Sequence, residues 1–514
     1  MELNRFSLPV AAAIMMINAS LLVQGCLEEE RSALLQIKTS IFDPNQNHFG
    51  ASQLLTWGND ALCCSWKGVS CDNITGRVNE IDLFNVRGWI FDPSKRDWSL
   101  DPSKGDWYLN ATLFLPFQEL KTLDLNLNAI AGCVANEGFE RLSRLNKLES
   151  LDLGDNNFNN SVLSSLKGLS SLKYLYLWGN RLNGSIDTKD FDSLSKLEEL
   201  HLSGNEIQNF VTSTGFERPG SLDKLEILDL GSNRINDSNL SSLKGLSSLQ
   251  HLNLYNNQLK GSMDMKGSFQ LPNHSLVNLS RLDISRNEID NQIPTEIGSC
   301  FPRLVFLNLS RNHFGGSIPS SISNMSGLAV LDLSNNGLSG NIPEQLVEGS
   351  LSLRGLVLSN NRLKGQLLWK SFNLANLTNL ILSGNQLTGI LPDRLSNGSR
   401  LKALDVSLNN LTGKIPRWIG YMSSLKYLDI SENNLSGSLP SNFCSSGTMA
   451  DVYFSKNKLE GSLIEIFDGC QSLDRLDLSH NYFRGSIPES IGSSLQLSFL
   501  LLGYNNLEGN HRYQ

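Results

Sequence analysis

The pattern Leu-x-Leu-x-x-Asn recurs along this chain at a nearly regular interval, and it constrains the fold more than any other feature. Ile81 and Leu83 form a weaker first copy, in which Val86 replaces the asparagine. The steps between the other copies vary at first and settle to 24 or 25 residues after Asn287. Sixteen asparagines carry the pattern: Asn128, Asn156, Asn180, Asn205, Asn233, Asn257, Asn287, Asn312, Asn336, Asn361, Asn385, Asn409, Asn433, Asn457, Asn481 and Asn505.

A period of about 20–29 residues with this signature predicts a leucine-rich-repeat solenoid. The leucines alternate with polar residues, as in "LDLS", which predicts a short strand with one buried face. Strands of successive turns should stack as a parallel sheet, because no single turn can bury its own apolar face. The asparagine amide should face inward and satisfy backbone groups of its own and adjacent turns. The following Gly-x-Ile-Pro, as at residues 413–416, predicts a tight turn and an extended segment.

The N-terminus reads as a secretory signal peptide over residues 1–25. Arg5 precedes the apolar run "LPVAAAIMMI", and Val23 and Gly25 suit a cleavage after Gly25. The alternative is a membrane anchor, but ten apolar residues are too few to span about 30 Å of hydrocarbon. Export places the eight cysteines in an oxidising compartment, where pairing is the default. Their spacing shows no zinc motif, so we expect no metal and no cofactor.

The sequence predicts a binding protein and no enzyme, because no catalytic motif is present. The net charge of −8 argues against nucleic acid as the partner. On a concave sheet, the side chains that face outward lie six, four and two residues before each repeat asparagine. Neighbouring turns carry unusual residues there, and exposed aromatics on a rigid sheet are common binding hot spots. The alternative is that these residues reflect sequence drift or are covered by a long loop that packs on them. The predicted ligand-binding residues are Tyr174, Tyr176, Trp178, Glu199, His201, His251 and Tyr255.

The mature chain also contains many Asn-x-Ser/Thr sequons, which predict glycosylation in an exported protein. Asn308 differs from the others because it falls on an outward strand position. The predicted sites are Asn73, Asn110, Asn159, Asn183, Asn236, Asn239, Asn273, Asn278, Asn308, Asn324, Asn376, Asn397, Asn410 and Asn434.

The unit "LxxLxxLxLxxNxLxGxIPxxL" resembles the plant-specific class of leucine-rich repeats. Residues 26–72, which include "CLEEERSALLQIKTSI" and "CCSWKGVSC", resemble the cap of plant receptor-like kinases, receptor-like proteins and polygalacturonase inhibitors. "WYLNATLFLPFQELKTLDL" further resembles receptor-like proteins of the disease-resistance (Cf-like) type. This resemblance implies an α/β-type superhelix with a parallel concave sheet, a 3-10 or irregular convex side, and a disulfide-bonded cap. It also implies the pairs Cys26–Cys63 and Cys64–Cys71. Cys444 and Cys470 lie about one turn apart, so a bond between turns and two free thiols both stay open.

The expected organisation is a signal peptide, a cap over 26–72, and about 17 repeats over 73–514 with a long insertion at 87–118. The C-terminal cap, membrane helix and tail of the resembled receptors are missing from the sequence, as is any kinase, so we expect a C-terminally truncated extracellular part. The resemblance implies recognition of a peptide, protein or glycan in immune or developmental signalling, with a leucine-rich-repeat co-receptor kinase as partner. The full-length protein would then sit at the outer face of the plasma membrane through a C-terminal helix, and without that helix it would be secreted to the apoplast. The alternatives are a secreted inhibitor of cell-wall-degrading hydrolases or decoy, and a truncated non-functional paralogue.

Overall fold

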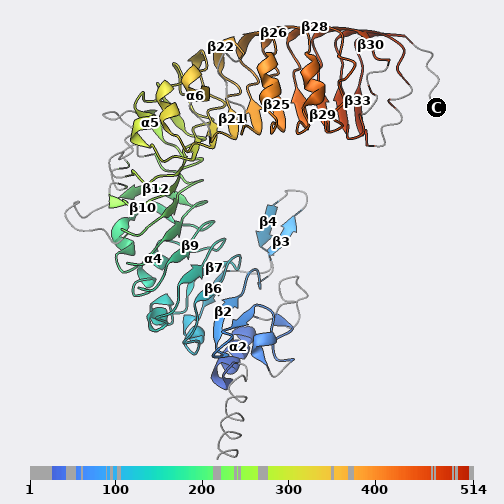
Figure 1. Ribbon diagram of the computed structural model, residues 1–514. Coiled ribbons are helices and arrows are strands. Elements are labelled where there is room, and N and C mark those ends of the chain that lie inside the picture. The colour runs from blue at the N-terminus through green and yellow to red at the C-terminus, as the bar shows by residue number, and fades with distance from the viewer. Residues whose placement is uncertain are drawn as a thin grey trace, which may run out of the picture. The chain divides into compact units, whose positions relative to one another are not determined.

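The computed structural model describes residues 26–41, 54–59, 62–87, 89–92, 97–100, 106–211, 222–236, 240, 243, 245–263, 276–348, 352–367, 375–464, 467, 470–488, 491 and 496–508. The signal peptide predicted at 1–25 and the sequons at Asn239 and Asn273 lie outside these residues. The chain divides into two compact parts (Figure 1). Unit 1 comprises residues 1–236 and 241–249, and unit 2 comprises residues 237–240 and 250–514. Each is described by itself.

Unit 1 contains a sheet of seven short strands. The first pair is antiparallel, and every later pair is parallel and in register. In each paired triplet of the repeat strands the middle residue is a buried leucine or isoleucine, and each stacks on its equivalent in the next turn. This is the stacking that the leucine period predicts. The strands are β1 (Val69–Cys71), β2 (Val78–Asp82), β6 (Thr122–Asp124), β8 (Ser150–Asp152), β9 (Tyr174–Tyr176), β11 (Glu199–His201) and β13 (Ile227–Asp229).

Unit 2 continues the same repeat with eleven parallel strands, again paired in register. They are β14 (His251–Asn253), β16 (Arg281–Asp283), β18 (Phe306–Asn308), β19 (Val330–Asp332), β21 (Gly355–Val357), β23 (Asn379–Ile381), β25 (Ala403–Asp405), β27 (Tyr427–Asp429), β29 (Asp451–Tyr453), β31 (Arg475–Asp477) and β33 (Phe499–Leu501).

A second parallel sheet in unit 2 lies just after the repeat asparagines, where the sequence predicts only a turn and an extended segment. Its glycines adopt the left-handed conformation: Gly413 has φ of +86°, and a Cβ there would come within 2.8 Å of Ile390 Cγ2. The strands are β20 (Ser339–Gly340), β22 (Arg362–Gln366), β24 (Gln386–Gly389), β26 (Asn410–Gly413), β28 (Asn434–Gly437), β30 (Lys458–Ser462), β32 (Tyr482–Gly485) and β34 (Asn506–Leu507).

Smaller strand pairs occur elsewhere in the described residues. The predicted insertion at 87–118 contains an antiparallel hairpin and one strand that pairs with the next turn. The pairs are β3 (Trp89–Asp92) with β4 (Asp97–Leu100), β5 (Trp107–Leu109) with β7 (Ile130–Cys133), β10 (Asn183–Asp187) with β12 (Glu206–Val211), and β15 (Lys260–Ser262) with β17 (Glu288–Asp290).

Short helical turns fill the segments that lead from one repeat to the next, as expected for this class of repeat. The 3-10 helices are η2 (Ala111–Phe114), η3 (Phe139–Arg144), η4 (Thr188–Phe191), η6 (Ser320–Asn324), η7 (Asp393–Asn397) and η8 (Arg417–Tyr421). The α-helices are α4 (Ser161–Ser165), α5 (Ile297–Cys300) and α6 (Glu344–Glu348).

The repeat asparagines form the ladder that the sequence predicts. Asn156 donates from Nδ2 to the carbonyls of Leu125, Leu153 and Gly154 at 2.9–3.0 Å. Its Oδ1 accepts from the Ile130 N–H at 2.9 Å. One buried side chain therefore satisfies backbone groups of two neighbouring turns, which a buried turn would otherwise leave unpaired.

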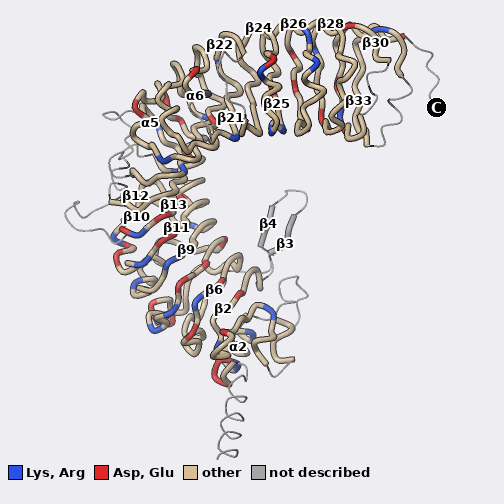
Figure 2. Tube along the Cα trace, viewed as in Figure 1, with Lys and Arg blue, Asp and Glu red and all other residues tan. Residues whose placement is uncertain are grey.

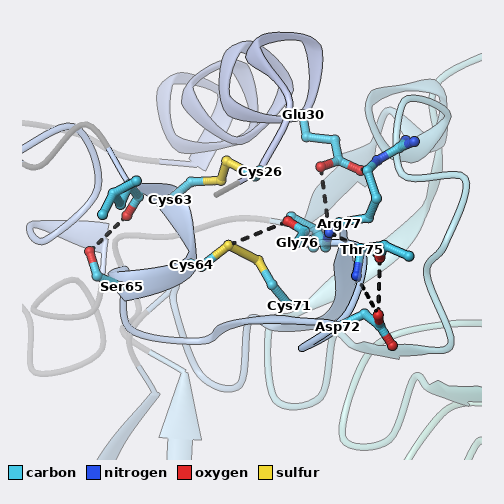
Figure 3. Close-up of a disulfide and its surroundings, with 12 residues drawn as sticks. Cys26, Glu30, Cys63, Cys64, Ser65, Cys71, Asp72, Thr75, Gly76 and Arg77 are labelled. Carbon is cyan, nitrogen blue, oxygen red and sulfur yellow. Dashed lines mark hydrogen bonds and ion pairs between the residues drawn. A yellow bond between two sulfur atoms is a disulfide. The ribbon is translucent and has the colours of Figure 1, made fainter. Parts of the chain in front are cut away.

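The N-terminal cap begins with α2 (Glu28–Ile41), whose first turn is acidic and whose buried face includes Leu34 and Ile37. The two disulfides implied by the family resemblance, Cys26–Cys63 and Cys64–Cys71, are confirmed (Figure 3). The short helix η1 (Cys63–Ser65) contains Cys63 and Cys64, so it holds one cysteine of each of these two disulfides.

A third disulfide joins Cys444 to Cys470 between adjacent turns of unit 2. Of the two possibilities that the sequence left open, the structure therefore has the bonded one. Cys133 and Cys300, in contrast, form no disulfide in the part of the chain that the structure describes.

Candidate ligand-binding face of unit 1

Unit 1 carries five of the seven predicted ligand-binding residues. Tyr174 and Tyr176 lie on β9, Trp178 lies two residues after the end of this strand, and Glu199 and His201 lie on β11. All five are half-buried on the sheet face opposite the leucine core. They lie there because alternate residues of a strand point to opposite faces.

Tyr176 and His201 stack on each other, with ring centroids 4.8 Å apart and planes 23° apart. His201 Nε2 lies 3.2 Å from Glu199 Oε2, and its Nδ1 lies 3.9 Å from Asp229 Oδ2. Burial opposes protonation of His201, but hydrogen bonds to Asp229 and Glu199 outweigh it and raise the pKa of the imidazole. Burial followed by the Glu199 charge raises the pKa of Tyr176 to about 12, so its hydroxyl stays protonated.

Trp178 lies across the turn that follows β8. A Cβ built on Gly154 would come within 2.6 Å of Cε2 and Nε1 of the indole and within 2.6 Å of Asn126 Nδ2. Only a glycine at this position leaves room for the ring. The aromatic side chain is therefore held against a notch in the neighbouring turn.

A row of carboxylates lies on the three strands that precede the aromatic residues in the sheet. Asp82, Asp124 and Asp152 are in register on β2, β6 and β8, and Asp152 is in register with Tyr176. Burial raises the pKa of Asp124 to about 6. A hydrogen bond from the backbone of Asn126 opposes the rise, and the charges of Asp152 and Asp82 add to it.

We predict opposite stability effects for the same substitution at Asp124 and at Asp229, which is in register with His201 on β13. Native Asp124 holds its proton to higher pH than the unfolded chain, so its ionised form destabilises the fold above about pH 6. Asp124→Asn should therefore stabilise the protein at pH 7 by about 1–2 kcal/mol after allowing for solvent screening. The gain should fade as the pH drops below 6 and vanish near pH 4. Urea unfolding at pH 7 and at pH 4, followed by circular dichroism, measures the difference in stability between the variant and the wild-type protein.

The matched variant is Asp229→Asn. Burial opposes ionisation of Asp229, but hydrogen bonds from His201 and the Gly231 N–H lower its pKa. Its charge therefore stabilises the fold above the unfolded pKa, and this contribution is lost as the pH falls. Asp229→Asn should destabilise the protein at pH 7 by roughly 1 kcal/mol. Changes in stability of the same sign for the two variants would contradict this description of the two aspartates.

The two remaining predicted residues, His251 and Tyr255, belong to unit 2. The Arg286 guanidinium lies 5.4 Å from the Tyr255 ring centroid. His251 begins β14, in register with Arg281 on β16. Both are half-buried on the sheet face of their own unit.

Unit 2 also carries an aromatic pair that the sequence analysis did not single out. Tyr427 and Tyr453 lie on adjacent strands with ring centroids 5.8 Å apart. Tyr453 hydrogen-bonds to Arg475, which lies 3.9 Å from Asp451. Each of the two turns contributes only one tyrosine to its strand, so neither turn stands out in the sequence. Scanning diagonal positions on neighbouring strands would have found the pair.

Asn308 occupies a strand position that neighbouring turns fill with aspartate. Its Nδ2 donates to Asp283 Oδ2 at 3.1 Å and to Ser285 Oγ at 3.2 Å, and its Oδ1 accepts from Ser310 N at 3.0 Å. Glycosylation of Asn308 stays a prediction, as it does at the other sequons.

Within the described ranges, no group of three or more His, Cys, Asp or Glu side chains is placed to hold a metal ion. None of the described helices combines the length and apolar character that crossing a membrane requires.

Comparison with known proteins identifies the class. The model described as leucine rich repeat N-terminal domain matches residues 27–72. Leucine rich repeat models match residues 146–207, 208–261, 375–435, 278–300, 303–325, 327–348 and 472–494. The chain therefore belongs to the leucine-rich-repeat proteins.

Its relatives include plant proteins named as receptors or receptor-like proteins. The chain is 32% identical over 272 residues to Cuscuta receptor 1 of Solanum lycopersicum, covering 49% of this chain and 22% of that protein. It is 33% identical over 259 residues to Receptor-like protein 13 of Arabidopsis thaliana, covering 49% and 23%. The matched segment thus covers less than a quarter of the length of each of these curated relatives.

A solved structure shows the same fold. The Arabidopsis receptor kinase HAESA, in complex with the peptide hormone IDA and the co-receptor SERK1, matches with a TM-score of 0.65 and 28% identity. The match covers 94% of this chain and 82% of that one.

Proposed function

We propose that this chain is the ligand-recognition part of a plant cell-surface receptor-like protein and that it binds an extracellular peptide. The observation that carries this proposal is the cluster on unit 1, where Tyr176, His201 and Trp178 are fixed by stacking, hydrogen bonds and the notch at Gly154. Aromatic side chains that are already ordered lose little entropy on binding, and such residues dominate hot spots.

The similar proteins support a peptide as ligand. HAESA is a receptor kinase that was solved with a peptide hormone and a co-receptor, and the other named relatives are receptors. By analogy, the partner for signalling is a leucine-rich-repeat co-receptor kinase, and the protein acts at the outer face of the plasma membrane. A role in immunity or development follows from the same analogy.

The test is a double substitution, Tyr176→Ala with Trp178→Ala. Peptides are first selected on the wild-type protein from a random library, and the best binder is labelled with fluorescein. The double variant should weaken this peptide's binding by more than about 1–2 kcal/mol, roughly five- to thirtyfold, because the aromatic contact area is lost. Fluorescence anisotropy measures the affinity.

The matched control is Tyr427→Ala with Tyr453→Ala, which removes the aromatic pair of unit 2. It should leave the affinity within about twofold. Thermal unfolding by circular dichroism checks that both variants fold. Equal losses from the two double variants, or a loss only from the control, would place the site elsewhere, and failure to select any peptide would refute the proposed function.

A further inference from the structure

We propose that the sheet face of unit 2 binds an acidic segment of a polypeptide partner. An aliphatic side chain of this segment would lie on Val357 and Ile381, and its carboxylates would lie beside Arg354 and Lys402. This surface is on a different unit from the aromatic cluster described above, so the inference goes beyond the proposed function. Three independent observations on strands β21, β23 and β25 support it.

The first observation is an apolar floor, formed by Val357 and Ile381, where other turns of unit 2 carry polar residues. Asp332, Val357, Ile381 and Asp405 are in register at the last position of four successive strands. The two aspartates follow the repeat consensus, and the valine and isoleucine interrupt it with half-buried apolar side chains. A partner that covers these side chains removes apolar surface from water, which favours binding.

Gly355 extends the apolar floor at the first position of β21. Among the described residues outside its own chain neighbours, a Cβ built on Gly355 would meet only the two methyl groups of Val330, at 3.7 Å. A methyl group therefore fits there without a clash, and the glycine leaves this space to a ligand. Asn379 and the small residue Ala403 follow Gly355 in register on β23 and β25. An aliphatic side chain is the ligand group that matches such a surface.

The second observation is a pair of unused hydrogen-bond donors beside the apolar floor. In a turn that follows the consensus, the serine two places after the aspartate donates to it twice. Ser407 donates to Asp405 Oδ1 from N at 3.0 Å and from Oγ at 2.7 Å. Ser359 and Ser383 stand two places after the valine and the isoleucine, where this carboxylate is missing. Within the described ranges, neither serine donates a hydrogen bond from its N–H or its hydroxyl.

Two adjacent turns thus share the same departure from the consensus. The apolar residue removes an acceptor that other turns have, while the serine that would use this acceptor is retained. Ser359 is only 8% exposed, so an oxygen of a bound ligand would supply an acceptor that water supplies poorly. Departures from a local rule that lower stability are typical of functional surfaces.

The third observation is a basic edge without acidic partners. Arg354, Lys402 and Lys426 directly precede β21, β25 and β27, and all three side chains are exposed. None of them forms an ion pair in the part of the chain that the structure describes. In unit 1, by contrast, Lys173 at the equivalent position pairs with Glu149 at 2.9 Å. Figure 2 shows basic segments of the chain beside the labels β21 and β25. This uncompensated positive charge selects an acidic partner.

The experiment compares three fluorescein-labelled glycine–serine peptides. The first carries a central leucine with two glutamates on each side, the second has glutamines in place of the glutamates, and the third has glycine in place of the leucine. Fluorescence anisotropy at low salt should show that the first peptide binds the wild-type protein about tenfold tighter than either of the others. Added salt should reduce its advantage over the glutamine peptide, because salt screens charges at the surface.

Val357→Asp with Ile381→Asp restores the consensus aspartate in both turns. It should remove the preference for the first peptide, because the apolar floor becomes charged and both serines gain an acceptor of their own. The fold should be spared, so thermal unfolding followed by circular dichroism should give a midpoint at least as high as that of the wild-type protein. The matched control is Asn253→Asp with Asn308→Asp, which adds two carboxylates at the same strand position of β14 and β18. It should leave the binding within about twofold.

Three results would overturn the inference. They are equal binding of the three peptides, binding that survives Val357→Asp with Ile381→Asp, and an equal loss in the matched control. Polygalacturonate that displaces the first peptide at a lower mass concentration than the unlabelled peptide would also overturn it, because the surface would then belong to an acidic polysaccharide.

Tyr176→Ala with Trp178→Ala separates this inference from the proposed function. This variant should bind the acidic leucine peptide as the wild-type protein does, although it loses the library-selected peptide. Loss of the acidic peptide would move its site to unit 1 and overturn the inference. Unchanged binding of the library-selected peptide would refute only the proposed function.

Discussion

Asn361→Ala should lower the free energy of unfolding of unit 2 by about 3–5 kcal/mol. Asn361 is 9% exposed and donates from Nδ2 to the carbonyls of Leu333, Leu358 and Ser359 at 3.0–3.2 Å. Its Oδ1 accepts from the Leu338 N–H at 3.0 Å. Alanine leaves these buried groups without partners and out of reach of water. Urea unfolding followed by far-ultraviolet circular dichroism measures the change.

Asn505→Ala is the matched control. Asn505 makes the same set of bonds, to the carbonyls of Leu478, Leu502 and Gly503 and from the Phe483 N–H, but it is only half-buried. Water can replace some of the hydrogen bonds that the Asn505 side chain makes, so this substitution should lower the free energy of unfolding by only about 1 kcal/mol. A loss at Asn505 as large as that at Asn361 would show that burial does not set the strength of the ladder.

Arg77→Met should destabilise the N-terminal cap by about 3–5 kcal/mol. Arg77 Nε lies 2.7 Å from Glu30 Oε1, and the glutamate side chain is 0% exposed (Figure 3). Without the guanidinium, Glu30 keeps only backbone donors such as the Leu27 N–H and is left as a buried, uncompensated charge. The stacked pair Trp57–Trp66 lies in the same cap, so near-ultraviolet circular dichroism during urea unfolding reports on it.

Arg31→Met provides the comparison on the same helix. Arg31 forms a salt bridge of 3.2 Å with Glu28, whose side chain is 81% exposed. An exposed pair contributes little, so this change should cost less than about 1 kcal/mol. Equal destabilisation by the two variants would mean that the Glu30–Arg77 pair is no stronger than a surface contact.

Much of the fold could be predicted from the sequence because the repeat imposes its own geometry. Counting back from each asparagine located the strand positions, and the inward asparagine followed from the need to satisfy buried backbone. The second sheet of unit 2 was not predicted. Segments such as Arg362–Gln366 show no strict alternation, and they become strands only because equivalent segments of adjacent turns pair with them.

The candidate site was predictable in position but not in its contacts. The unusual residues at Tyr176 and His201 were identified, but their stacking depends on rotamers that the spacing does not determine. Asp124 and Asp152 were passed over as part of the repeat consensus. Asn126 and Gly154 stand two residues after them, and the neighbouring strands place further aspartates or Tyr176 beside them. The sequence of one repeat does not show which residues of the adjacent turns surround an aspartate.

In unit 2, a serine stands two residues after each aspartate at the last position of a sheet strand, and this has a consequence for how the surface of the unit can change. Asn308 shows that asparagine fits the aspartate position, since its Oδ1 accepts from both N and Oγ of Ser310, at 3.0 and 2.7 Å. The same replacement at any of these aspartates would keep that acceptor and create Asn-x-Ser. The positions that qualify are Asp283, Asp332, Asp405, Asp429 and Asp477.

The corresponding aspartates of unit 1 cannot change in this way. Phenylalanine, asparagine or glycine stands two residues after each of Asp82, Asp124, Asp152 and Asp229. One codon change per turn could therefore place sugar at these five aspartate positions of unit 2, whereas the same change at the four aspartate positions of unit 1 would create no acceptor site. Two faces with the same backbone geometry thus differ in how readily they can be hidden from a partner.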